Sequence, residues 1–542
     1  AQNPYIRMKS EKKEILLPKN IFGTRLNSSG IDLSEKQNLE NLSVKLAKFK
    51  DKKINAESIY FGRNKSADRK FKASSISSNI DMGTINFDDP KDIKDCLEKN
   101  NSNEWGKIDV KKRTEILNRV AESIEKDPYE LIFYLINEAG KTIQNAVDEI
   151  REGVDFLRYY AEQALKIIEE RELEGPTGEE NKILYSPKGR FLCISPWNFP
   201  VAILIGQISA ALSCGNKVIA KPSEHTSILG YLVVLKFHEC GVPLSALELI
   251  LGDGSYGDML TKINSLQGVA FTGSLPTAKK IQSNLIENQN QIVPLIAETG
   301  GINSMLVDSS ALLEQVTDDV IRSAFDSAGQ RCSALRVLCI QEEIYEELVE
   351  MIKGNMITQK IGDPNNFDTD IGPIITKQSI EKLNKYIDKC REQNFDVFQT
   401  TKNTDDMHIS PTLITINKIS DIKNEQFGPI LHLLKYKSNN TDKLINDINK
   451  TGYGLTMGIH SRIESRADYF GKQSNIGNIY INRDMVGAVV GSQPFGGVGL
   501  SGSGFKAGGP NYLLQFLNEK VISKNSVAFG GNTELLNLQE DL

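Results

Sequence analysis

The spacing of apolar residues predicts helices in the first third of the chain and short strands after it. Apolar side chains recur every three or four positions in two segments, first at Ile116, Val120 and Ile124 and then at Val147, Ile150, Val154 and Leu157. This spacing places them on one face of a helix, so we expect two or three surface helices before residue 170. Residues 175–178 form a turn, and short β-type runs between residues 183 and 194 flank a second turn at 187–189, which predicts a projecting hairpin.

From residue 191 to residue 301 the pattern changes to a repeated order of strand, turn and helix. Residues 218–220, 247–251 and 269–271 are short apolar runs, and each is followed by Gly, Ser or Pro and then by a helical stretch. This rhythm predicts an α/β fold with a parallel sheet and helices on its faces.

The remaining segments are of four kinds. A second α/β stretch runs from about residue 304 to residue 482, and a glycine-rich segment at 487–509 and a strand-like run at 513–522 follow it. Residues 1 to about 78 are polar, with a serine-rich stretch at 74–78. We therefore expect the N-terminal 78 residues to be an arm or linker that adds little to the core.

Composition narrows the class of protein. The 542 residues are 39% hydrophobic and 25% charged, which is typical of a multi-domain globular protein. The net charge of -6 is reached without a long basic run, so nucleic acid is not an expected partner. The most apolar stretch, residues 201–212, is shorter than the roughly 20 residues of a spanning helix. We expect no membrane span.

Cysteine and histidine usage indicates the compartment and the kind of site. The seven cysteines are an odd number without paired spacing, as expected of reduced thiols, and residues 1–20 lack the apolar centre of a secretory signal. A cytoplasmic location is expected. The five histidines are scattered, which argues against a metal site. Since the first residue is Ala rather than Met, we also consider that the chain is a piece of a longer one.

Three segments carry features of a dinucleotide site. Gly252, Gly254 and Gly257 form a G-x-G-x-x-G after a predicted strand. No acid for the ribose lies about 20 residues further on, so a tight turn explains these glycines as well. Residues 221–224 (Lys-Pro-Ser-Glu) offer a better ribose ligand, or else a surface turn. Residues 271–274 (Phe-Thr-Gly-Ser), at a strand-to-helix junction, either bind a phosphate through free backbone N–H groups or cap the helix.

Three other residues are candidates for covalent chemistry. Residues 195–200 (Ser-Pro-Trp-Asn-Phe-Pro) form a stiff loop that either holds the Asn198 amide as an oxyanion hole requires or serves packing alone. Cys332 follows small residues and Arg331, a cation that could favour its thiolate. The other six cysteines lie in apolar contexts, and no histidine lies near Cys332 as a base. Glu298, between an apolar run and two glycines, is the alternative base or else a solvated loop acid.

The order of seven motifs resembles the aldehyde dehydrogenase superfamily from about residue 80 to residue 525. In sequence, they are WNFP, KPSE, FTGS, ETGG at 298–301, GQRC at 329–332, EQFGP at 425–429 and PFGG at 494–497. Seven motifs in this order make the resemblance specific. A closer resemblance is to the pyrroline-5-carboxylate dehydrogenase half of the bifunctional proline utilization A proteins. It rests on residues 17–19, 27–34, 327–335, 487–491 and 530–532.

The resemblance implies an aldehyde dehydrogenase fold with a Rossmann-like NAD-binding domain, an α/β catalytic domain and an oligomerisation β-hairpin. The implied segments are an arm at 1–78, the NAD-binding domain at 79–301 with its hairpin at about 175–194 and a return at about 484–512, the catalytic domain at 302–483, and a C-terminal strand and tail at 513–542. A homodimer or higher homo-oligomer is implied as well. No segment resembles the FAD-binding proline dehydrogenase barrel of the bifunctional proteins. The chain is therefore expected to be a cut domain or a stand-alone enzyme, with a proline dehydrogenase domain or partner upstream.

The resemblance also implies residue roles. The Cys332 thiolate attacks the aldehyde, the Asn198 amide and the Cys332 backbone N–H stabilise the oxyanion, and Glu298 activates water. The residues implied to bind the NAD cofactor are Ser195, Pro196, Trp197, Lys221, Ser223, Glu224, Gly254, Gly257, Thr272, Gly273, Ser274, Glu425 and Phe427. Since the Glu224 carboxylate would repel a 2′-phosphate, NAD should be preferred to NADP.

For the substrate, the resemblance implies L-glutamate-γ-semialdehyde, the hydrolysed form of 1-pyrroline-5-carboxylate, oxidised to L-glutamate in proline catabolism. The residues implied to bind it are Arg331, Ser333, Gly487, Ala488, Phe199 and Phe495. Two alternatives remain open. One is an aldehyde dehydrogenase for another carboxylated aldehyde such as succinate semialdehyde, and the other is a non-catalytic nucleotide-binding scaffold.

Overall fold

The computed structural model describes residues 16–63, 68–78, 80–99, 102–400, 406–487, 489–526 and 528. The tail motif at 530–532 and Ala488 lie outside the described residues. Within the described residues, no helix combines the length and the apolarity that crossing a bilayer requires.

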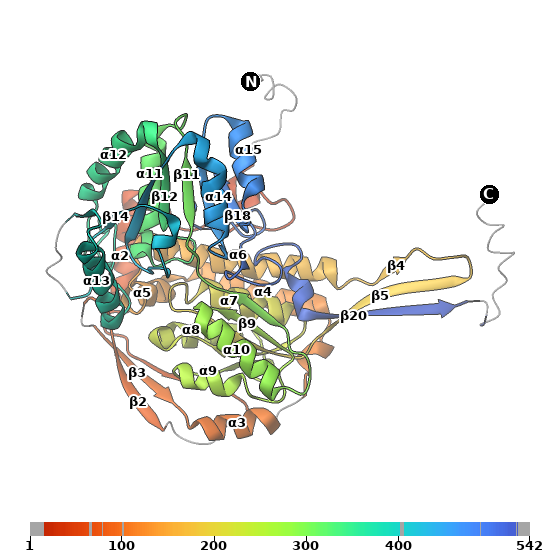
Figure 1. Cartoon of the computed structure of the whole chain (residues 1–542). Coiled ribbons are helices and arrows are strands. Elements are labelled where there is room, and N and C mark those ends of the chain that lie inside the picture. Colours follow the sequence, from red (N-terminus) through yellow and green to blue (C-terminus); the bar gives the residue numbers. More distant parts are fainter. Residues whose placement is uncertain are drawn as a thin grey trace.

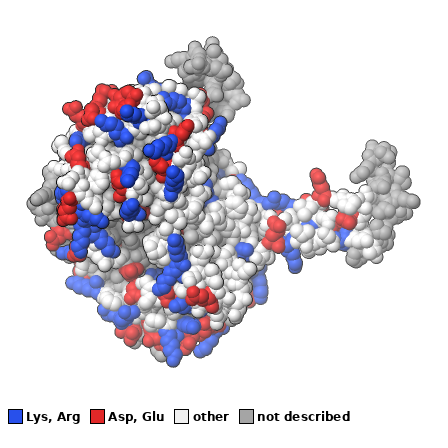
Figure 2. Space-filling view, viewed as in Figure 1, with Lys and Arg blue, Asp and Glu red and all other residues white. Residues whose placement is uncertain are grey.

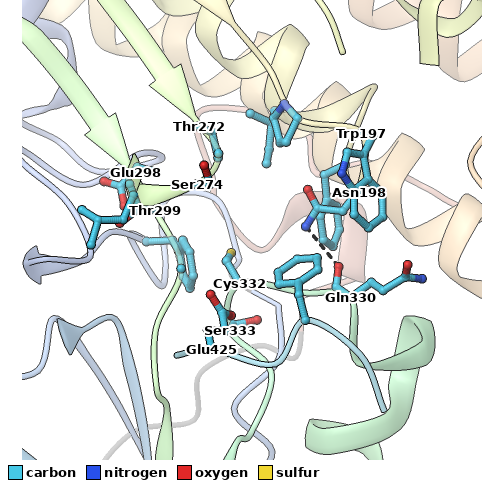
Figure 3. A pocket seen from close by; sticks show the side chains of 18 of the residues that line it. Trp197, Asn198, Thr272, Ser274, Glu298, Thr299, Gln330, Cys332, Ser333 and Glu425 are labelled. Carbon is cyan, nitrogen blue, oxygen red and sulfur yellow. Dashed lines mark hydrogen bonds between the residues drawn. The ribbon is translucent and has the colours of Figure 1, made fainter. Parts of the chain in front are cut away.

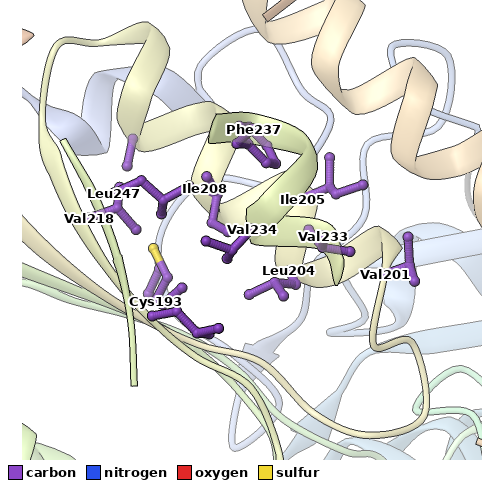
Figure 4. Close-up of a cluster of buried hydrophobic side chains, with 14 of the residues drawn as sticks. Cys193, Val201, Leu204, Ile205, Ile208, Val218, Val233, Val234, Phe237 and Leu247 are labelled. Atoms are coloured by element: carbon purple, nitrogen blue, oxygen red, sulfur yellow. The ribbon is translucent and has the colours of Figure 1, made fainter. Parts of the chain in front are cut away.

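The strand, turn and helix rhythm after residue 191 folds into the expected parallel sheet (Figure 1). Its strands, in spatial order, are β10 (Leu295–Glu298), β9 (Gly268–Thr272), β6 (Arg190–Ile194), β7 (Lys217–Lys221) and β8 (Leu247–Leu249), and every pair is parallel. The connecting helices are α7 (Ala202–Ser213), α8 (Ser227–Glu239), α9 (Gly254–Leu260) and α10 (Leu275–Asn288). Figure 4 shows α7 and α8 packing their apolar side chains against this sheet, for example Ile208 and Val234 near Cys193. Burial on both faces explains why these strands read as continuous apolar runs.

The second α/β stretch forms a seven-stranded sheet. In spatial order the strands are β13 (Val397–Gln399), β14 (Thr412–Ile416), β15 (Ile430–Tyr436), β12 (Val337–Gln341), β11 (Ser304–Val307), β17 (Thr456–His460) and β18 (Asn478–Ile481). Only β13 pairs antiparallel. The helices of this part are α11 (Leu313–Phe325), α12 (Tyr345–Thr358), α13 (Lys377–Glu392), α14 (Thr441–Asn449) and α15 (Glu464–Gln473). A two-stranded ribbon of β16 (Tyr453–Gly454) and β19 (Val498–Gly499) lies beside it.

The buried apolar residues form two clusters, one around each sheet. The first cluster extends through Ala297 and takes up Val490 and residues 512–517 near the C-terminus, whereas the second extends from Ile302 to Met485. The chain therefore passes from one core to the other between β10 and β11, and it returns to the first core after β18.

The described residues between 90 and 167 form four α-helices that precede the first sheet: α3 (Pro90–Lys99), α4 (Val110–Lys126), α5 (Tyr129–Asn137) and α6 (Ile143–Ile167). The helices expected around residues 116–124 and 147–157 are therefore present. However, α6 is not a surface helix, because it packs against both α4 and α7 and much of its circumference is buried.

Much of the expected N-terminal arm is part of the folded body. Helix α2 (Lys36–Ala47) buries Leu42, and β1 (Ile54–Glu57) and β2 (Arg69–Ser74) form a sheet with β3 (Asp81–Phe87) in the order β1-β3-β2. Ile54, Ala56 and Ala73 belong to the first cluster. The expectation of an arm with little core does not hold for these elements, because a few apolar side chains in a polar stretch suffice to dock it.

The projecting hairpin differs in its strands from the prediction. Strand β5 (Glu179–Pro187) pairs antiparallel with β4 (Arg171–Leu173) and with β20 (Leu517–Asn525), and Figure 1 shows these three strands extending from the body. Residues 190–194 do not return along β5. The turn at Gly189, whose φ is +137°, leads them into the first sheet as β6. The strand expected at 513–522 begins only at Leu517, after a 3-10 helix at Tyr512–Phe516.

On the face shown in Figure 2, basic and acidic side chains are interspersed over the body and along the projecting sheet. On the projecting sheet, Lys182 lies 2.9 Å from both Glu170 and Glu180, and Lys524 lies 3.2 Å from Glu180. This face carries no extended surface of a single charge.

Candidate active site

A cavity of about 710 Å³ lies where the carboxyl ends of β6, β9 and β10 face the second sheet. In parallel sheets, ligands bind at this edge because the loops leaving the strands meet there. The cavity is lined by residues from the segments predicted to bind the dinucleotide and from those predicted to carry the covalent chemistry (Figure 3). The predicted residues among them are Pro196, Trp197, Asn198, Phe199, Thr272, Gly273, Ser274, Glu298, Cys332, Ser333, Glu425, Phe427, Gly487 and Phe495.

Other predicted residues do not line this cavity. Lys221, Ser223 and Glu224 lie at the carboxyl end of β7, where Lys221 Nζ is 3.8 Å from Glu224 Oε2. Ser195 is buried beside them, and its backbone N–H donates to the Lys221 carbonyl over 3.2 Å. This set therefore occupies the same sheet edge as the cavity, one strand further along.

The glycine motif after β8 has two kinds of glycine. A Cβ on Gly252 would lie 2.2 Å from the Tyr256 ring, so packing requires glycine there. A Cβ on Gly254 or Gly257 would meet no atom within 4 Å. Folding alone therefore gives no steric reason for the latter two glycines, which stand at the start of α9.

The loop that carries Cys332 has an unusual backbone. Ser327, Ala328 and Gly329 have φ values of 53°, 55° and 65°, which is the left-handed region. A Cβ on Gly329 would lie 2.2 Å from the Gly428 carbonyl oxygen, so only glycine fits. Such strain persists only where the surroundings impose it. Here Arg336 does so, since its guanidinium donates to the carbonyls of Gly329 (2.8 Å) and Gly428 (3.2 Å).

The thiol of Cys332 is not activated by its neighbour Arg331. The Arg331 guanidinium is engaged by Asp326 (2.7 Å) and also bonds Asn145. Burial raises the pKa of Cys332 to about 12, and the charges of Glu425 and Glu298 add to that rise. The expectation that the adjacent cation favours the thiolate is therefore wrong, because Arg331 is held in an ion pair and acids face the sulfur.

Asn198 and Cys332 are linked through the backbone of Gln330. The Asn198 amide donates to the Gln330 carbonyl over 3.1 Å. Gln330 is fixed in turn, since its side chain donates to the Pro373 carbonyl (3.1 Å) and accepts from the Ile375 N–H (3.0 Å). The amide and the thiol are thus presented to one cavity by two loops that hold each other.

Glu298 ends β10 and lines the same cavity. Burial raises the pKa of its carboxyl to about 8, although the Gly497 N–H and the charge of Lys506 act in the opposite direction. A carboxyl with this pKa changes protonation state near neutral pH, which suits a general base. The solvated loop acid is not what the structure shows.

A buried ion pair supports the Asn198 loop, and the sequence interpretation missed it. Lys141 Nζ lies 2.6 Å from Glu149 Oε2, and both side chains are almost fully buried. Glu149 Oε1 accepts from the backbone N–H groups of Val201 (2.8 Å) and Ala202 (3.2 Å), and the Lys141 ammonium lies 3.7 Å from the Phe199 ring centroid. Glu149 lies in α6 among several other charged residues and Lys141 precedes that helix, so spacing along the sequence did not distinguish this pair.

Two further acids, Glu152 and Glu425, line the cavity. Glu152 was not singled out, yet it lines the cavity, and burial raises its pKa to about 7. Glu425 was expected near the cofactor. Its carboxylate lies 3.2 Å from the Arg336 guanidinium, which lowers a pKa that burial otherwise raises.

The comparisons with known proteins agree with this fold. The profile of the aldehyde dehydrogenase family matches residues 64–522, and the chain belongs to that family. The chain is similar to the bifunctional protein PutA of Escherichia coli strain K12 (41% identity over 95% of this chain and 39% of that protein). It is also similar to the 1-pyrroline-5-carboxylate dehydrogenase of Oceanobacillus iheyensis (31% identity over 91% of this chain and 98% of that protein).

Among solved structures, a bifunctional proline utilization A (PutA) protein superposes with a TM-score of 0.86 at 38% identity, covering 96% of this chain and 50% of that one. The chain thus spans about two fifths to one half of the length of the PutA proteins it matches. The resemblance stated from the motifs is confirmed, and so is the α/β aldehyde dehydrogenase fold.

Proposed function

We propose that this chain oxidises L-glutamate-γ-semialdehyde to L-glutamate with NAD, through a covalent intermediate on Cys332. The observation that carries the proposal is the convergence of Cys332, Asn198 and Glu298 on one cavity. A scaffold that had lost the chemistry would not need a nucleophile, an amide and a base in the same enclosure. The name of the Oceanobacillus relative, which this chain matches over almost its whole length, supports the choice of substrate.

The chemistry assigned to the residues is acyl transfer through a thioester. The Cys332 thiol loses its proton to solvent, its sulfur adds to the aldehyde carbon, and the Asn198 amide with the Cys332 backbone N–H stabilises the resulting oxyanion. When bound, NAD supplies the hydride acceptor. After hydride loss, the acyl group is held as a thioester. Glu298 then takes a proton from water, the water oxygen replaces sulfur at the acyl carbon, and Cys332 and the acid are released.

The residues present suit a dinucleotide. Thr272, Gly273 and Ser274 line the cavity where α10 begins, and a helix N-terminus favours a phosphate group. Gln207 also lines the cavity, and among the described residues its Oε1 is buried without a hydrogen-bond partner. We assign the pyrophosphate to Ser274, the adenosine ribose to Lys221 and Glu224, and the nicotinamide ribose to Glu425 and Phe427. Trp197, which lies edge-on to Phe427 at 5.7 Å between ring centroids, would form the adjoining wall.

The far end of the cavity would hold the amino-acid end of the substrate. We assign the α-carboxylate to the Ser333 hydroxyl and to the backbone N–H groups of Gly487 and Ala488. Ser333 and Gly487 line the cavity, whereas Ala488 lies outside the described residues. Phe199 and Phe495 would flank the aliphatic stem. The Arg331 side chain is engaged by Asp326, so it would contribute through its charge behind Phe199, 5.3 Å from the ring centroid.

We also propose how the chain divides and assembles. Residues 79–301, with a return at about 484–512, would form the NAD-binding domain and residues 302–483 the catalytic domain. The two apolar clusters support the boundary near residue 301, although the first cluster also takes in Ile54, Ala56 and Ala73 from before residue 79. The projecting strands β4, β5 and β20 would form the surface for a second copy. A proline dehydrogenase domain or partner would supply the substrate, as the name of the PutA relatives suggests.

The test is NADH formation from NAD across four aldehydes: L-glutamate-γ-semialdehyde, succinate semialdehyde, propanal and hexanal. The semialdehyde of glutamate should have the highest kcat/KM, and Cys332→Ala should abolish turnover of all four. If succinate semialdehyde has the highest kcat/KM, it replaces L-glutamate-γ-semialdehyde as the proposed substrate. Equal efficiency on propanal or hexanal would refute selection by the far end of the cavity.

A further inference from the structure

We propose that Arg25, in the N-terminal segment, is a positioning residue for the loop that receives the carboxylate end of the substrate. Of this loop the structure describes Val486, Gly487 and residues 489–491, and Gly487 lines the cavity. This inference rests on the proposed function, because it concerns the same end of the substrate. It also gives a role to the motif at residues 27–34, which the chemistry does not use.

Arg25 is buried against the far side of this loop. Its Nη2 donates to the Val490 carbonyl over 2.8 Å, across 465 positions of sequence. Its Nε lies 3.7 Å from Glu162 Oε2, and its guanidinium lies 3.7 Å from the centroid of the Phe22 ring. Only 8% of the residue is exposed. A charged donor to a buried carbonyl, with its charge balanced by an acid, is a strong and directional contact.

The segment that carries Arg25 is fixed to the body by its own side chains. The Ser28 N–H and hydroxyl donate to the two oxygens of Asp155, each over 2.8 Å, and the Ser29 N–H donates to Glu125 over 2.8 Å. A Cβ on Gly30, whose φ is +65°, would lie 2.4 Å from the Arg151 side chain. The motif is thus fitted to α4 and α6, and it sets the place from which Arg25 reaches the loop.

Further contacts hold the end of the loop that Arg25 contacts. Gly491, with φ +85°, donates to the Gly508 carbonyl over 2.9 Å, and a Cβ there would lie 2.7 Å from Arg25 Nη2 and 3.0 Å from the Tyr159 ring. Val490 is buried in the first apolar cluster. Gly487, three residues before Val490, faces the cavity with φ +79°. The Val490 end of the loop is therefore anchored on Arg25 and α6, while Gly487, at the other end, lines the cavity.

The experiment compares Arg25→Met with the unmodified enzyme on L-glutamate-γ-semialdehyde and on propanal, which has no carboxylate. Methionine keeps an unbranched apolar side chain and removes the donor. KM for the semialdehyde should rise about tenfold, the size expected for loss of one hydrogen bond to a charged group. The inhibition constant of L-glutamate against propanal oxidation should rise equally. The kcat/KM for propanal should stay within about twofold, and Arg25→Lys should recover most of the loss.

A matched control is Arg119→Met, because Arg119 also donates to a backbone carbonyl, that of Cys240 at 3.1 Å, on another face of the molecule. Arg119→Met should leave the kinetic constants for both aldehydes unchanged. If Arg25→Met does not fold, Ser28→Ala takes its place, since it removes one bond to Asp155 and leaves Arg25 intact. If Arg25→Met lowers kcat/KM equally for both aldehydes, or changes it for neither, the proposed role of Arg25 is overturned. If instead the unmodified enzyme shows no preference for the semialdehyde, the proposed function fails.

Discussion

The backbone N–H of Gly497 donates a hydrogen bond of 3.1 Å to the Glu298 carboxylate. Glycines surround this carboxylate for a steric reason: a Cβ on Gly496 would lie 2.7 Å from Glu298 Oε1, and one on Gly502 would lie 2.9 Å from Oε2. The backbone of the glycine-rich segment therefore packs closely around the carboxyl group, and burial raises the pKa of Glu298 to about 8. The same enclosure leaves one side open to the cavity.

The first prediction concerns pH. Glu298 can accept a proton from water only in its ionised form. Because its pKa is raised to about 8, this ionised form is lost as pH falls through about 8. Steady NADH formation limited by thioester hydrolysis should therefore rise with pH from 6 to 8 and level off above it. Glu298→Gln should keep a single rapid burst of NADH and lose steady turnover, as measured by stopped-flow absorbance. Glu152→Gln, which alters another acid of the cavity wall, should keep the rise near pH 8. A flat profile for the unmodified enzyme would contradict the assignment.

The second prediction concerns the thiol. Since the pKa of Cys332 is raised to about 12, its thiolate fraction should grow about tenfold per pH unit over the accessible range. Without added NAD, alkylation of Cys332 by iodoacetamide should accelerate about 100-fold from pH 7 to pH 9, as followed by mass spectrometry. A plateau below pH 8 would show an activated thiolate instead. Cys332→Ala serves as the labelling control, and it should bind NAD normally while forming no NADH.

The third prediction concerns cofactor choice. Glu224 stands at the end of β7 beside Lys221, where the adenosine ribose is proposed to lie. Its carboxylate would repel a 2′-phosphate, so kcat/KM should be higher with NAD than with NADP. Glu224→Gln should narrow this gap, chiefly by improving NADP. Glu239→Gln, which removes an exposed acid at the end of α8, should leave the ratio unchanged. Equal use of both cofactors by the unmodified enzyme would rule out this role.

The fourth prediction concerns Ser333, which follows Cys332 and lines the cavity. A hydrogen bond to a charged group contributes about 1.5–3 kcal/mol, so Ser333→Ala should lower kcat/KM for the glutamate semialdehyde by roughly 10- to 150-fold. The kcat/KM for propanal should change little in the same variant. The control is Ser379→Ala, because Ser379 lines the same cavity from α13 and is assigned no contact with the substrate. An equal loss on both aldehydes would mean that Ser333 acts on the nucleophile rather than on the carboxylate.

Local pattern was sufficient for much of the fold. The helical spacing of Val147, Ile150 and Val154 predicts α6, and the apolar runs at 218–220 and 269–271 predict β7 and β9. These features are readable because the periods of helix and strand are properties of neighbouring residues. The order of motifs likewise grouped Cys332, Glu298 and Asn198 as candidates, and the structure places all three in the wall of one cavity, although each taken alone had a plausible structural explanation.

Tertiary structure decided the features that depend on distant partners. Residues 190–194 joined the first sheet rather than a hairpin because β7 and β9 pair with them on both sides. Arg331 turned toward Asp326, and the Cys332 thiol is surrounded by acids from positions 298 and 425, so the adjacent cation does not set its pKa. Arg25 reaches Val490 across 465 positions. Burial, charge and hydrogen bonding between such residues exist only after the chain has folded, and for that reason spacing along the sequence determined the elements and the motifs but not the environment of each side chain.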